Sequence, residues 1–485
     1  MKKYDLVTIG GGACGLAAAL TVAAEGGSVL VLDKADALGG MTKYAEGMFA
    51  VGTKYQREMK LPYKVEDRFR AHMQEAKWQA NPRLVRAFME KTADTLDWLE
   101  DMGCEFTGVV AFYPGAPFVW HTIKGRPEGK HGSDAPAKYG ILRNFYKKME
   151  EYDNLEVMLN AKVTEILREE NGPVTGVRVT TGDGEEIVVE ASCVLCATGG
   201  YGNDKQFMKD YCKNGENIVI MFDEEQTGDS IKMAWAIGAE KEGMGVHQTF
   251  TLVDRENITT MLQQIAGQPN LWVNKLGERY CDESIVNEFP SAINALVKQP
   301  EATAYSIIDS NMINYLETEG LQYTLGEYFT PGSILTGVQA ELERGVSEGK
   351  VLAGDSIEEL AAKIGCDPAV FAETVEEYNA CCRKNDDFIM AKDRQYLHEI
   401  SGPKYYAVEI RACLGITEGG IKVNHKMEVI DTEYKVIPGL YAGGCAAGGM
   451  IGDSYIMITS GGSLSFALNS GRITGENVLK YVGRA

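Results

Sequence analysis

The chain has 485 residues, of which 45 % are hydrophobic and 24 % charged, and its net charge is −21 at neutral pH. A chain of this length exceeds one ordinary hydrophobic core, so we expect two domains or one large domain with an insertion. The negative charge argues against nucleic-acid partners and against docking on an anionic membrane. We find no apolar run of about 18 residues, so we expect no membrane insertion and a cytoplasmic location.

The eleven cysteines are scattered through the chain, as is typical of free thiols in a reducing compartment. Cys193 and Cys196 lie in an apolar run, where we expect two buried side chains of a strand. No second C-x-x-C accompanies them, so we predict no metal site.

The first expected element is a strand that runs into a glycine-rich turn. Residues 6–9 are apolar, and Gly10, Gly12 and Gly15 then give the spacing G-x-G-x-x-G ahead of an Ala/Leu-rich helix. In a dinucleotide-binding unit these glycines make the turn, admit a pyrophosphate and let helix and strand pack closely. A second strand ends in Asp33, 18 residues after Gly15, where a carboxylate can bind a ribose hydroxyl. The sequence therefore predicts a dinucleotide site.

Helices and an aromatic loop come next. Apolar residues recur near helical spacing between residues 61 and 103. Segment 106–132 is broken by glycine and proline and carries aromatic residues and histidines, among them Phe112, Trp120, His121 and His131. Such loops are often functional, although a packed loop without a direct role fits as well.

Strands and glycine turns follow. Residues 155–159, 164–167, 174–180 and 186–189 alternate like antiparallel strands. A strand at 193–197 runs into another glycine turn, and glycine becomes dense again after residue 419. Between about 246 and 400 the composition is mixed α and β without phosphate-binding glycine loops, which indicates an inserted domain.

Four segments together resemble the fumarate reductase/succinate dehydrogenase flavoprotein superfamily: residues 10–33, 39–48, 197–202 and 437–463. The resemblance covers essentially the whole chain and implies FAD as the cofactor. It also implies an α/β fold, with a Rossmann-like FAD-binding domain built from residues 1–245 and 401–485. An α+β capping domain, residues 246–400, would be inserted between these two parts and would hold the substrate.

The resemblance assigns cofactor contacts residue by residue. It places the ADP half of FAD on Gly10, Gly12, Gly15 and Asp33, and the adenine against Val163. It places the flavin and pyrophosphate against Gly40, Thr42 and Gly47. It places the isoalloxazine against Gly462, Ser463 and Leu464. Further implied contacts are Ala13, Cys14, Lys34, Gly39, Met41, Met48, Ala197, Thr198, Gly199, Asp229 and Gly444. Relatives with covalent flavin carry a histidine after their double glycine, and residues 41–47 contain none, so we expect non-covalent FAD.

The sequence departs from the superfamily at the substrate site. Fumarate reducers place an arginine proton donor eight residues after the arginine of G-x-R-F-x-N-E, whereas here Asn287 stands eight residues after Arg279. Their H-T-M-G-G histidine aligns with Ile416, and their H-G-A-N-R-L-G-G arginine falls at or near Tyr455. Their T-E-x-x-R-G carboxylate clamp has no match near residues 263–267. A dicarboxylate in a closed site needs paired cations, so we expect a substrate other than fumarate or succinate.

What remains suits a neutral, aromatic or polycyclic substrate. We expect a reductase in which hydride passes from flavin N5 to an electron-poor carbon while a side chain donates a proton. Tyr455 is the first choice for that acid, followed by His247 and Arg411, and Asn287 suits only substrate orientation. A tyrosine near the flavin loosely resembles the 3-ketosteroid dehydrogenase branch. The length and loops also resemble flavin reductases of anaerobic gut bacteria, with tetrahydrodaidzein to equol as one such reaction.

Other interpretations stay open. Tyr455 could be an aromatic residue packed beside the flavin, and His247 a satisfied polar core residue. The chain could be an FAD electron-transfer subunit serving a protein partner, although such a module would not need a capping domain, or a dehydrogenase or oxidase running in the opposite direction. We find no haem, iron–sulfur or second dinucleotide motif. Electrons would therefore come from NAD(P)H in the same cleft or from a separate redox protein.

Overall fold

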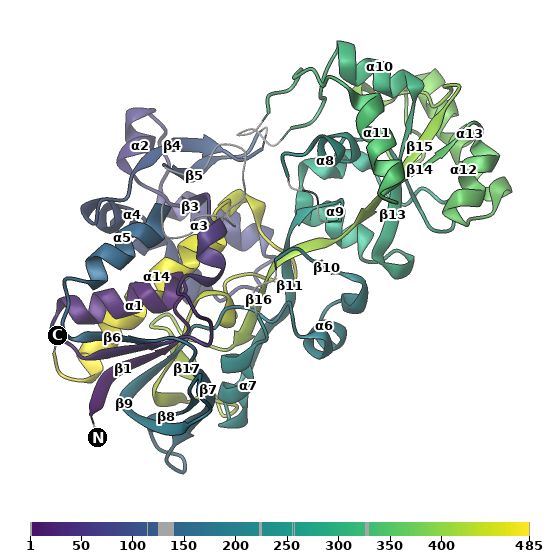
Figure 1. The fold of residues 1–485 in the computed structure, drawn as a ribbon. Coiled ribbons are helices and arrows are strands. Elements are labelled where there is room, and N and C mark those ends of the chain that lie inside the picture. Colours follow the sequence, from purple (N-terminus) through teal and green to yellow (C-terminus); the bar gives the residue numbers. More distant parts are fainter. Residues whose placement is uncertain are drawn as a thin grey trace.

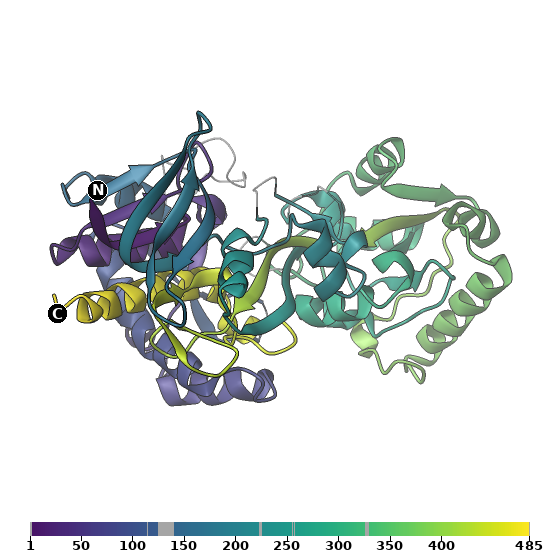
Figure 2. The same cartoon turned by 90° about the horizontal axis from the view of Figure 1, so that it is seen from below.

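The computed structural model describes residues 2–113, 115–124, 140–222, 226–254, 256, 258–324 and 329–484. Figure 1 shows two lobes joined by long strands, with both termini on one lobe. That lobe combines the purple N-terminal segments with the yellow C-terminal ones, and the green middle of the chain forms the other. Figure 2 shows the lobes side by side along the long axis of the molecule. The architecture is the expected α/β fold, a Rossmann-like domain with an inserted α+β capping domain.

The first lobe is organised around a sheet with the order β17-β18-β9-β1-β2-β6 among the described strands. Strand β1 (Lys3–Ile9) pairs in parallel with β2 (Val29–Leu32) and β9 (Glu186–Cys196), and β9 pairs in parallel with β18 (Val436–Ala442). At the edge, β17 (Glu428–Ile430) runs antiparallel to β18. Both β1 and β2 are almost wholly buried, as parallel strands between helical layers are.

The antiparallel prediction for residues 155–159 is wrong. Strand β6 (Leu155–Met158) pairs in parallel with β2, whereas β7 (Lys162–Arg168) and β8 (Val174–Thr180) do pair antiparallel. An edge strand such as β6 exposes one side whichever way it pairs, so alternating polarity does not reveal strand direction.

Two helices from opposite ends of the chain pack against each other beside this sheet. They are α1 (Ala13–Ala24) and α14 (Gly462–Tyr481), purple and yellow in Figure 1. A Cβ at Gly471 would lie 2.3 Å from the carbonyl oxygen of Cys14, so only glycine permits this approach. The predicted helices between residues 61 and 103 are confirmed as α3 (Val65–Glu75) and α4 (Pro82–Asp101). The other helices of this part are α2 (Lys54–Glu58), α5 (Gly140–Met149), α6 (Lys205–Tyr211) and α7 (Asp229–Ala236).

Two three-stranded sheets border the site. One has the order β3-β5-β4, formed by β3 (Gly47–Phe49), β5 (Phe118–Ile123) and β4 (Phe106–Ala111). The other has the order β10-β16-β11, formed by β10 (Val219–Ile220), β16 (Cys413–Ile421) and β11 (Lys241–Thr251). Strands β11 and β16 run between the two lobes in Figure 1.

The capping lobe is built on a sheet with the order β12-β13-β15-β14. Its strands are β12 (Leu271–Asn274), β13 (Thr303–Asp309), β15 (Tyr405–Arg411) and β14 (Val351–Gly354). Its helices are α8 (Met261–Ala266), α9 (Phe289–Leu296), α10 (Ser310–Thr318), α11 (Val338–Ser347), α12 (Ile357–Ile364) and α13 (Pro368–Lys384). Strand β15 lies beyond residue 400, so this sheet extends past the expected limit of the insertion. The domain limits themselves stay a prediction.

Two expectations from composition concern cysteines and membrane spans. All eleven cysteines are free thiols, and Cys193 and Cys196 are buried in β9, as predicted. Among the helices of the described residues, none combines the length and the hydropathy that a membrane crossing requires.

Candidate active site

A cavity of about 610 Å³ opens where the carboxyl ends of β1 and β2 meet the first turns of α1 and α14. Ligands of α/β proteins bind in this position, outside the carboxyl ends of parallel strands. Both lobes contribute to its lining, because Ile258 and Phe289 belong to the capping lobe.

The three motif glycines have the geometry that their spacing predicts. Gly10 has φ +108°, and a Cβ there would lie 2.4 Å from the carbonyl oxygen of Ala197. A Cβ at Gly15 would lie 2.0 Å from the carbonyl oxygen of Gly10, so helix and strand touch through bare backbone. A Cβ at Gly12, by contrast, would have no neighbour closer than 3.8 Å. The backbone at Gly12 is thus open to a bound group.

Polar contacts fix the walls at this end. The Asp33 carboxylate accepts hydrogen bonds from the N–H groups of Gly11 at 2.8 Å and Ala35 at 2.9 Å. Carboxylate oxygens have further lone pairs, so a ribose hydroxyl can still donate to Asp33. Lys34 forms an ion pair with Asp229, with Nζ and Oδ2 2.9 Å apart.

The N-terminus of α14 faces the other end of the cavity. Gly461, which precedes the helix, has φ +78°, and a Cβ there would lie 2.7 Å from Cδ1 of Trp120. Ser463 and Leu464, in the first turn, line the cavity. A 20-residue helix presents unpaired N–H groups and partial positive charge at this point, which favours an electron-rich ring edge.

Most residues predicted to bind the cofactor line this one cavity. They are Gly10, Gly12, Ala13, Cys14, Asp33, Lys34, Gly40, Met41, Thr42, Gly47, Val163, Ala197, Thr198, Gly199, Asp229, Gly444, Ser463 and Leu464. The structure places Gly15, Gly39, Met48 and Gly462 outside the lining. Gly15 instead supports the turn through Gly10, and Met48 is buried in β3.

The side of the cavity away from the motif glycines is aromatic, apolar or neutral. Its residues come from β5, β11, β16, α9 and neighbouring loops: Phe112, Trp120, Gln248, Ile258, Phe289, Ile416, Tyr455 and Met457. Among the described lining residues, the cationic side chains are Lys34, Lys43 and Lys162, and no arginine or histidine is present. All three lysines belong to the segments that carry the predicted ADP and flavin contacts. Among the described residues, the substrate side therefore offers no cation to a carboxylate.

Tyr455 lies in a buried polar cluster at this side. Its hydroxyl is 3.1 Å from Oγ of Ser463, and Ser463 in turn donates to the carboxyl of Glu418 and lies 3.3 Å from Oε1 of Gln248. Tyr455 is only 6 % exposed. Burial, reinforced by the nearby Glu418, raises the pKa of the Tyr455 phenol. The phenol thus stays protonated over the whole neutral range.

The other predicted catalytic residues lie elsewhere. His247 lines a separate small cavity beside Tyr455, and burial lowers the pKa of its imidazole. Arg411 is in β15 and donates to the carbonyl of Asn217 at 2.9 Å, outside the main lining. Asn287 ends the 3₁₀ turn η3 (Glu283–Asn287), and its side chain is outside the described structure. Of the four, the structure brings only Tyr455 to the cavity.

The two histidines noted in the aromatic loop have different outcomes. His121 is buried in β5, with Nε2 2.8 Å from Oγ1 of Thr53, and burial lowers its pKa to about 4. It does not line the cavity. His131 lies outside the described residues.

Sequence reasoning missed Gln248 and Glu418. Side chains alternate along a strand, so Glu418 shares a face of β16 with Ile416, the position that aligns with the superfamily's histidine. The two-residue period of a strand could therefore have identified Glu418 from the sequence. On β11 the same alternation gives Gln248, and not His247, to the main cavity.

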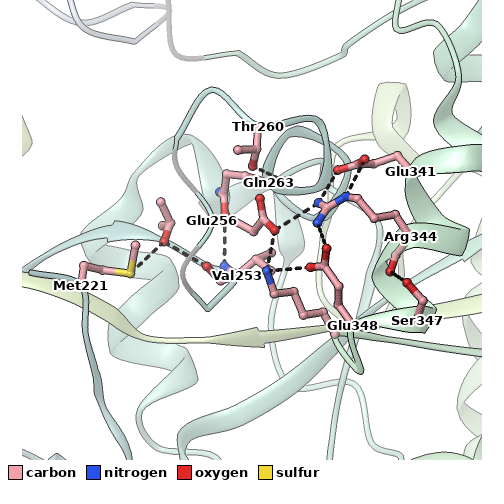
Figure 3. A network of polar contacts seen from close by, with 11 residues as sticks. Met221, Val253, Glu256, Thr260, Gln263, Glu341, Arg344, Ser347 and Glu348 are labelled. Atoms are coloured by element: carbon pink, nitrogen blue, oxygen red, sulfur yellow. Dashed lines mark hydrogen bonds and ion pairs between the residues drawn. The ribbon is translucent and has the colours of Figure 1, made fainter. Parts of the chain in front are cut away.

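Sequence reasoning also missed Ile258, and two residues before it the buried Glu256 joins an ion-pair network of the capping lobe (Figure 3). Glu256 accepts hydrogen bonds from Nη2 of Arg344 at 3.1 Å and Nζ of Lys350 at 2.6 Å. Although burial alone would raise the pKa of Glu256, hydrogen bonds from these cations and from Thr260 hold it below its usual value. These contacts therefore hold Glu256 in place close to Ile258 in the sequence.

These features define an FAD-dependent oxidoreductase. The bare backbone at Gly12 suits a pyrophosphate, and the carboxylate of Asp33 suits a ribose. The N-terminus of α14 suits an electron-rich ring. The sequence profile described as "FAD binding domain" matches residues 5–455, and the chain belongs to this family. The resemblance to the fumarate reductase superfamily is confirmed, and the chain is a fumarate-reductase-like, FAD-dependent reductase.

Individual relatives span nearly the whole chain. A vinyl phenol reductase from Lactiplantibacillus plantarum is 31 % identical over 99 % of this chain and 97 % of its own length. The open conformation of a flavocytochrome c3 fumarate reductase superposes with a TM-score of 0.73 at 26 % identity, covering 99 % of this chain and 78 % of that one. A 3-ketosteroid Δ1-dehydrogenase from Sterolibacterium denitrificans has a TM-score of 0.79 at 19 % identity, over 99 % of this chain and 100 % of that one, and shares the fold.

Proposed function

We propose that this reductase transfers a hydride to an electron-poor carbon of a neutral aromatic substrate that carries no carboxylate. The observation that supports this most directly is the aromatic substrate side of the cavity, where the described residues include no cation. A dicarboxylate there would lose its hydration without gaining an ion pair, which is costly in a closed site. An aromatic ring, by contrast, can pack against Phe112, Trp120 and Phe289.

When bound, FAD supplies the hydride from its N5. The chain's own residues orient the substrate and handle the proton. As the hydride arrives at one carbon, negative charge develops on the adjacent carbon or on a conjugated oxygen. The Tyr455 hydroxyl donates to that position, either as a hydrogen bond or as a transferred proton. Phe289 and Ile258, from the capping lobe, exclude water from the same space.

The comparisons support the substrate class. A relative that matches almost end to end at 31 % identity is named for vinyl phenol, a neutral aryl alkene. A substrate of this kind would take up hydride and proton on two adjacent carbons. A larger polyphenol such as tetrahydrodaidzein would use the same groups differently on its way to equol, with the hydride replacing a hydroxyl that takes the proton and leaves as water. A keto-steroid remains the alternative substrate, and we propose NAD(P)H or a reduced redox protein as the electron donor.

A panel of substrates tests the proposal under anaerobic conditions with reduced viologen as the donor. The panel contains vinyl phenol, tetrahydrodaidzein, an enone steroid, urocanate, cinnamate and fumarate. We expect turnover of one or more neutral aromatic compounds and none of fumarate. Efficient reduction of fumarate, urocanate or cinnamate, all of which are carboxylates, would contradict the proposal.

The Tyr455→Phe variant tests the acid. It should keep its FAD content and lose roughly 10²–10⁴-fold in turnover, the usual effect of a positioned acid. Tyr441→Phe is the matched control, because it removes the same hydroxyl from a buried tyrosine of β18 outside the cavity lining. Equal activity of both variants would leave Tyr455 as a packed aromatic residue.

A further inference from the structure

A chain of three polar groups leads from the cavity into the protein interior. The Tyr455 hydroxyl faces Ser463 at 3.1 Å, and Ser463 contacts the Glu418 carboxyl. Tyr455 and Ser463 line the cavity, whereas Glu418 lies behind them. Glu418 comes from β16, whereas Tyr455 and Ser463, eight residues apart, come from the loop before α14 and from the first turn of α14.

Glu418 is an unusual carboxyl group. It is 9 % exposed, and no lysine, arginine or histidine forms an ion pair with it in the described part of the chain. Burying an unpaired carboxylate is costly, so the neutral acid is favoured. Burial accordingly raises the pKa of Glu418 to about 7, although the hydrogen bond from Ser463 opposes the shift. This carboxyl can therefore hold a proton at neutral pH.

After each turnover Tyr455 must recover a proton from the protein interior. Once it has protonated a substrate, it would be left as a phenolate inside an apolar cavity. The described lining offers that phenolate no arginine or histidine, and burial disfavours the anion. A donor already connected to the phenol would remove this cost.

We propose that Glu418 holds the proton that replaces the one given up by Tyr455, and that Ser463 relays it. This inference rests on the proposed function of Tyr455 as the acid. Glu418 acts only through its neighbours and is a positioning and proton-storing residue.

The step balances as a shift of three protons. The O–H bond of Tyr455 breaks as a C–H bond forms on the substrate, which has received the hydride on the adjacent carbon. For this transfer the Ser463 hydroxyl turns from Glu418 to the Tyr455 oxygen and gives its proton there, while the protonated Glu418 turns its own O–H to Oγ of Ser463 and gives that proton in exchange. Glu418 is left as a carboxylate, and water returns a proton to it before the next turnover.

A small space beside Glu418 offers room for the water that returns this proton. A second cavity of about 10 Å³ is lined by Glu418 and Ser463 together with backbone of residues 243, 419, 448 and 449, all glycines. This volume is close to the minimum that holds one water molecule. Bare backbone keeps the space behind the carboxyl open.

The other titratable groups around Glu418 do not compete for the proton. Burial, with the charge of Glu418, raises the pKa of the Cys445 thiol well above its usual value, and Tyr455 behaves in the same way. On β11 the residue opposite Glu418 is Val246, and its neighbour His247 is neutral because burial lowers its pKa. Further along β16 and β11, Lys422 and Glu242 neutralise each other.

Variants of the relay test the inference with the substrate that the panel identifies. In the wild type the rate of substrate protonation should be level below about pH 7 and fall above it. Glu418→Gln should be roughly 10- to 100-fold slower and lack this dependence, because an amide has no proton to give. Glu242→Gln, the same change in the neighbouring ion pair, should behave like the wild type. FAD content is measured for every variant.

The double variant separates a relay from two independent effects. If Ser463 and Glu418 act in one path, Ser463→Ala combined with Glu418→Gln should be no slower than the slower single variant. Additive losses would contradict the relay. A Glu418→Gln enzyme with the wild-type rate and pH profile, beside an inactive Tyr455→Phe enzyme, would overturn the inference and leave the proposed function intact.

An infrared titration of the holoenzyme provides a readout without turnover. The carbonyl band of a protonated carboxyl group should disappear in the wild type as the pH rises through about 7, and should be missing in Glu418→Gln. In Ser463→Ala the midpoint should move higher, because the hydrogen bond that lowers the pKa is gone. A band that vanishes near the ordinary pKa of glutamate, about 4.3, would refute proton storage at Glu418.

Discussion

The buried carboxyl of Glu418 should make the stability of the protein depend on pH in a specific window. Its pKa is raised by burial from the ordinary 4.5 to about 7. Between these values the folded protein holds a proton on Glu418 that the unfolded chain has lost. The free energy of unfolding therefore falls as the pH rises through this window and levels off above it. A shift of about 2.5 units, at 1.36 kcal/mol each, corresponds to about 3 kcal/mol.

The assay is urea unfolding of the wild type and of Glu418→Gln at a series of pH values. The glutamine can still accept the Ser463 hydrogen bond but has no proton to exchange, so the wild type should lose about 3 kcal/mol relative to the variant between pH 4.5 and 7. Glu242→Gln is the matched control, since Glu242 is paired with Lys422. A difference between wild type and Glu418→Gln that stays constant with pH would refute the raised pKa.

Three further predictions concern the cofactor and the capping loop. Denaturation should release FAD into solution, because residues 41–47 contain no histidine to tether it, and flavin that precipitates with the chain would contradict this. Asp33→Ala should weaken FAD binding about 10- to 100-fold in a titration of the apoprotein, since a hydrogen bond to a charged group contributes roughly 1.5–3 kcal/mol; an unchanged affinity would refute the ribose contact. Glu256→Ala leaves Lys350 and Arg344 without their shared carboxylate and should cost about 1 kcal/mol of stability, because both cations stay partly solvated. It should also raise KM through Ile258 more than it lowers kcat, and the reverse ratio would count against the anchoring role.

The cofactor end of the cavity could be predicted because its signals are local. The spacing of Gly10, Gly12 and Gly15 is enough to recognise the phosphate-binding turn. The strand that ends in Asp33 follows soon after it in the sequence. Each of these positions is constrained by backbone geometry, such as the 2.0 Å between a Cβ at Gly15 and the Gly10 oxygen. For that reason the role of such glycines can be predicted from the sequence.

The substrate end could not be predicted to the same depth, because its parts meet only after folding. Glu418, Tyr455 and Ser463 come from β16, a loop and α14, and nothing local in the chain indicates that they touch. His247 and Gln248 are adjacent in sequence, but only Gln248 reaches the main cavity while both line the small one, so a choice between them needs the strand's orientation. Alignment with the fumarate reducers indicated which cations were lost but not which group replaced them.

The most direct test of the central claim is a rapid-mixing experiment with the reduced holoenzyme. The claim is that a cavity whose described substrate side is aromatic and carries no cation accepts neutral aromatic compounds and rejects dicarboxylates. The enzyme, reduced anaerobically, is mixed in turn with vinyl phenol, tetrahydrodaidzein, an enone steroid and fumarate, and the return of the oxidised flavin absorbance is recorded. We predict rapid oxidation by at least one neutral compound and none by fumarate at any concentration. Rapid, saturable oxidation by fumarate would contradict the account.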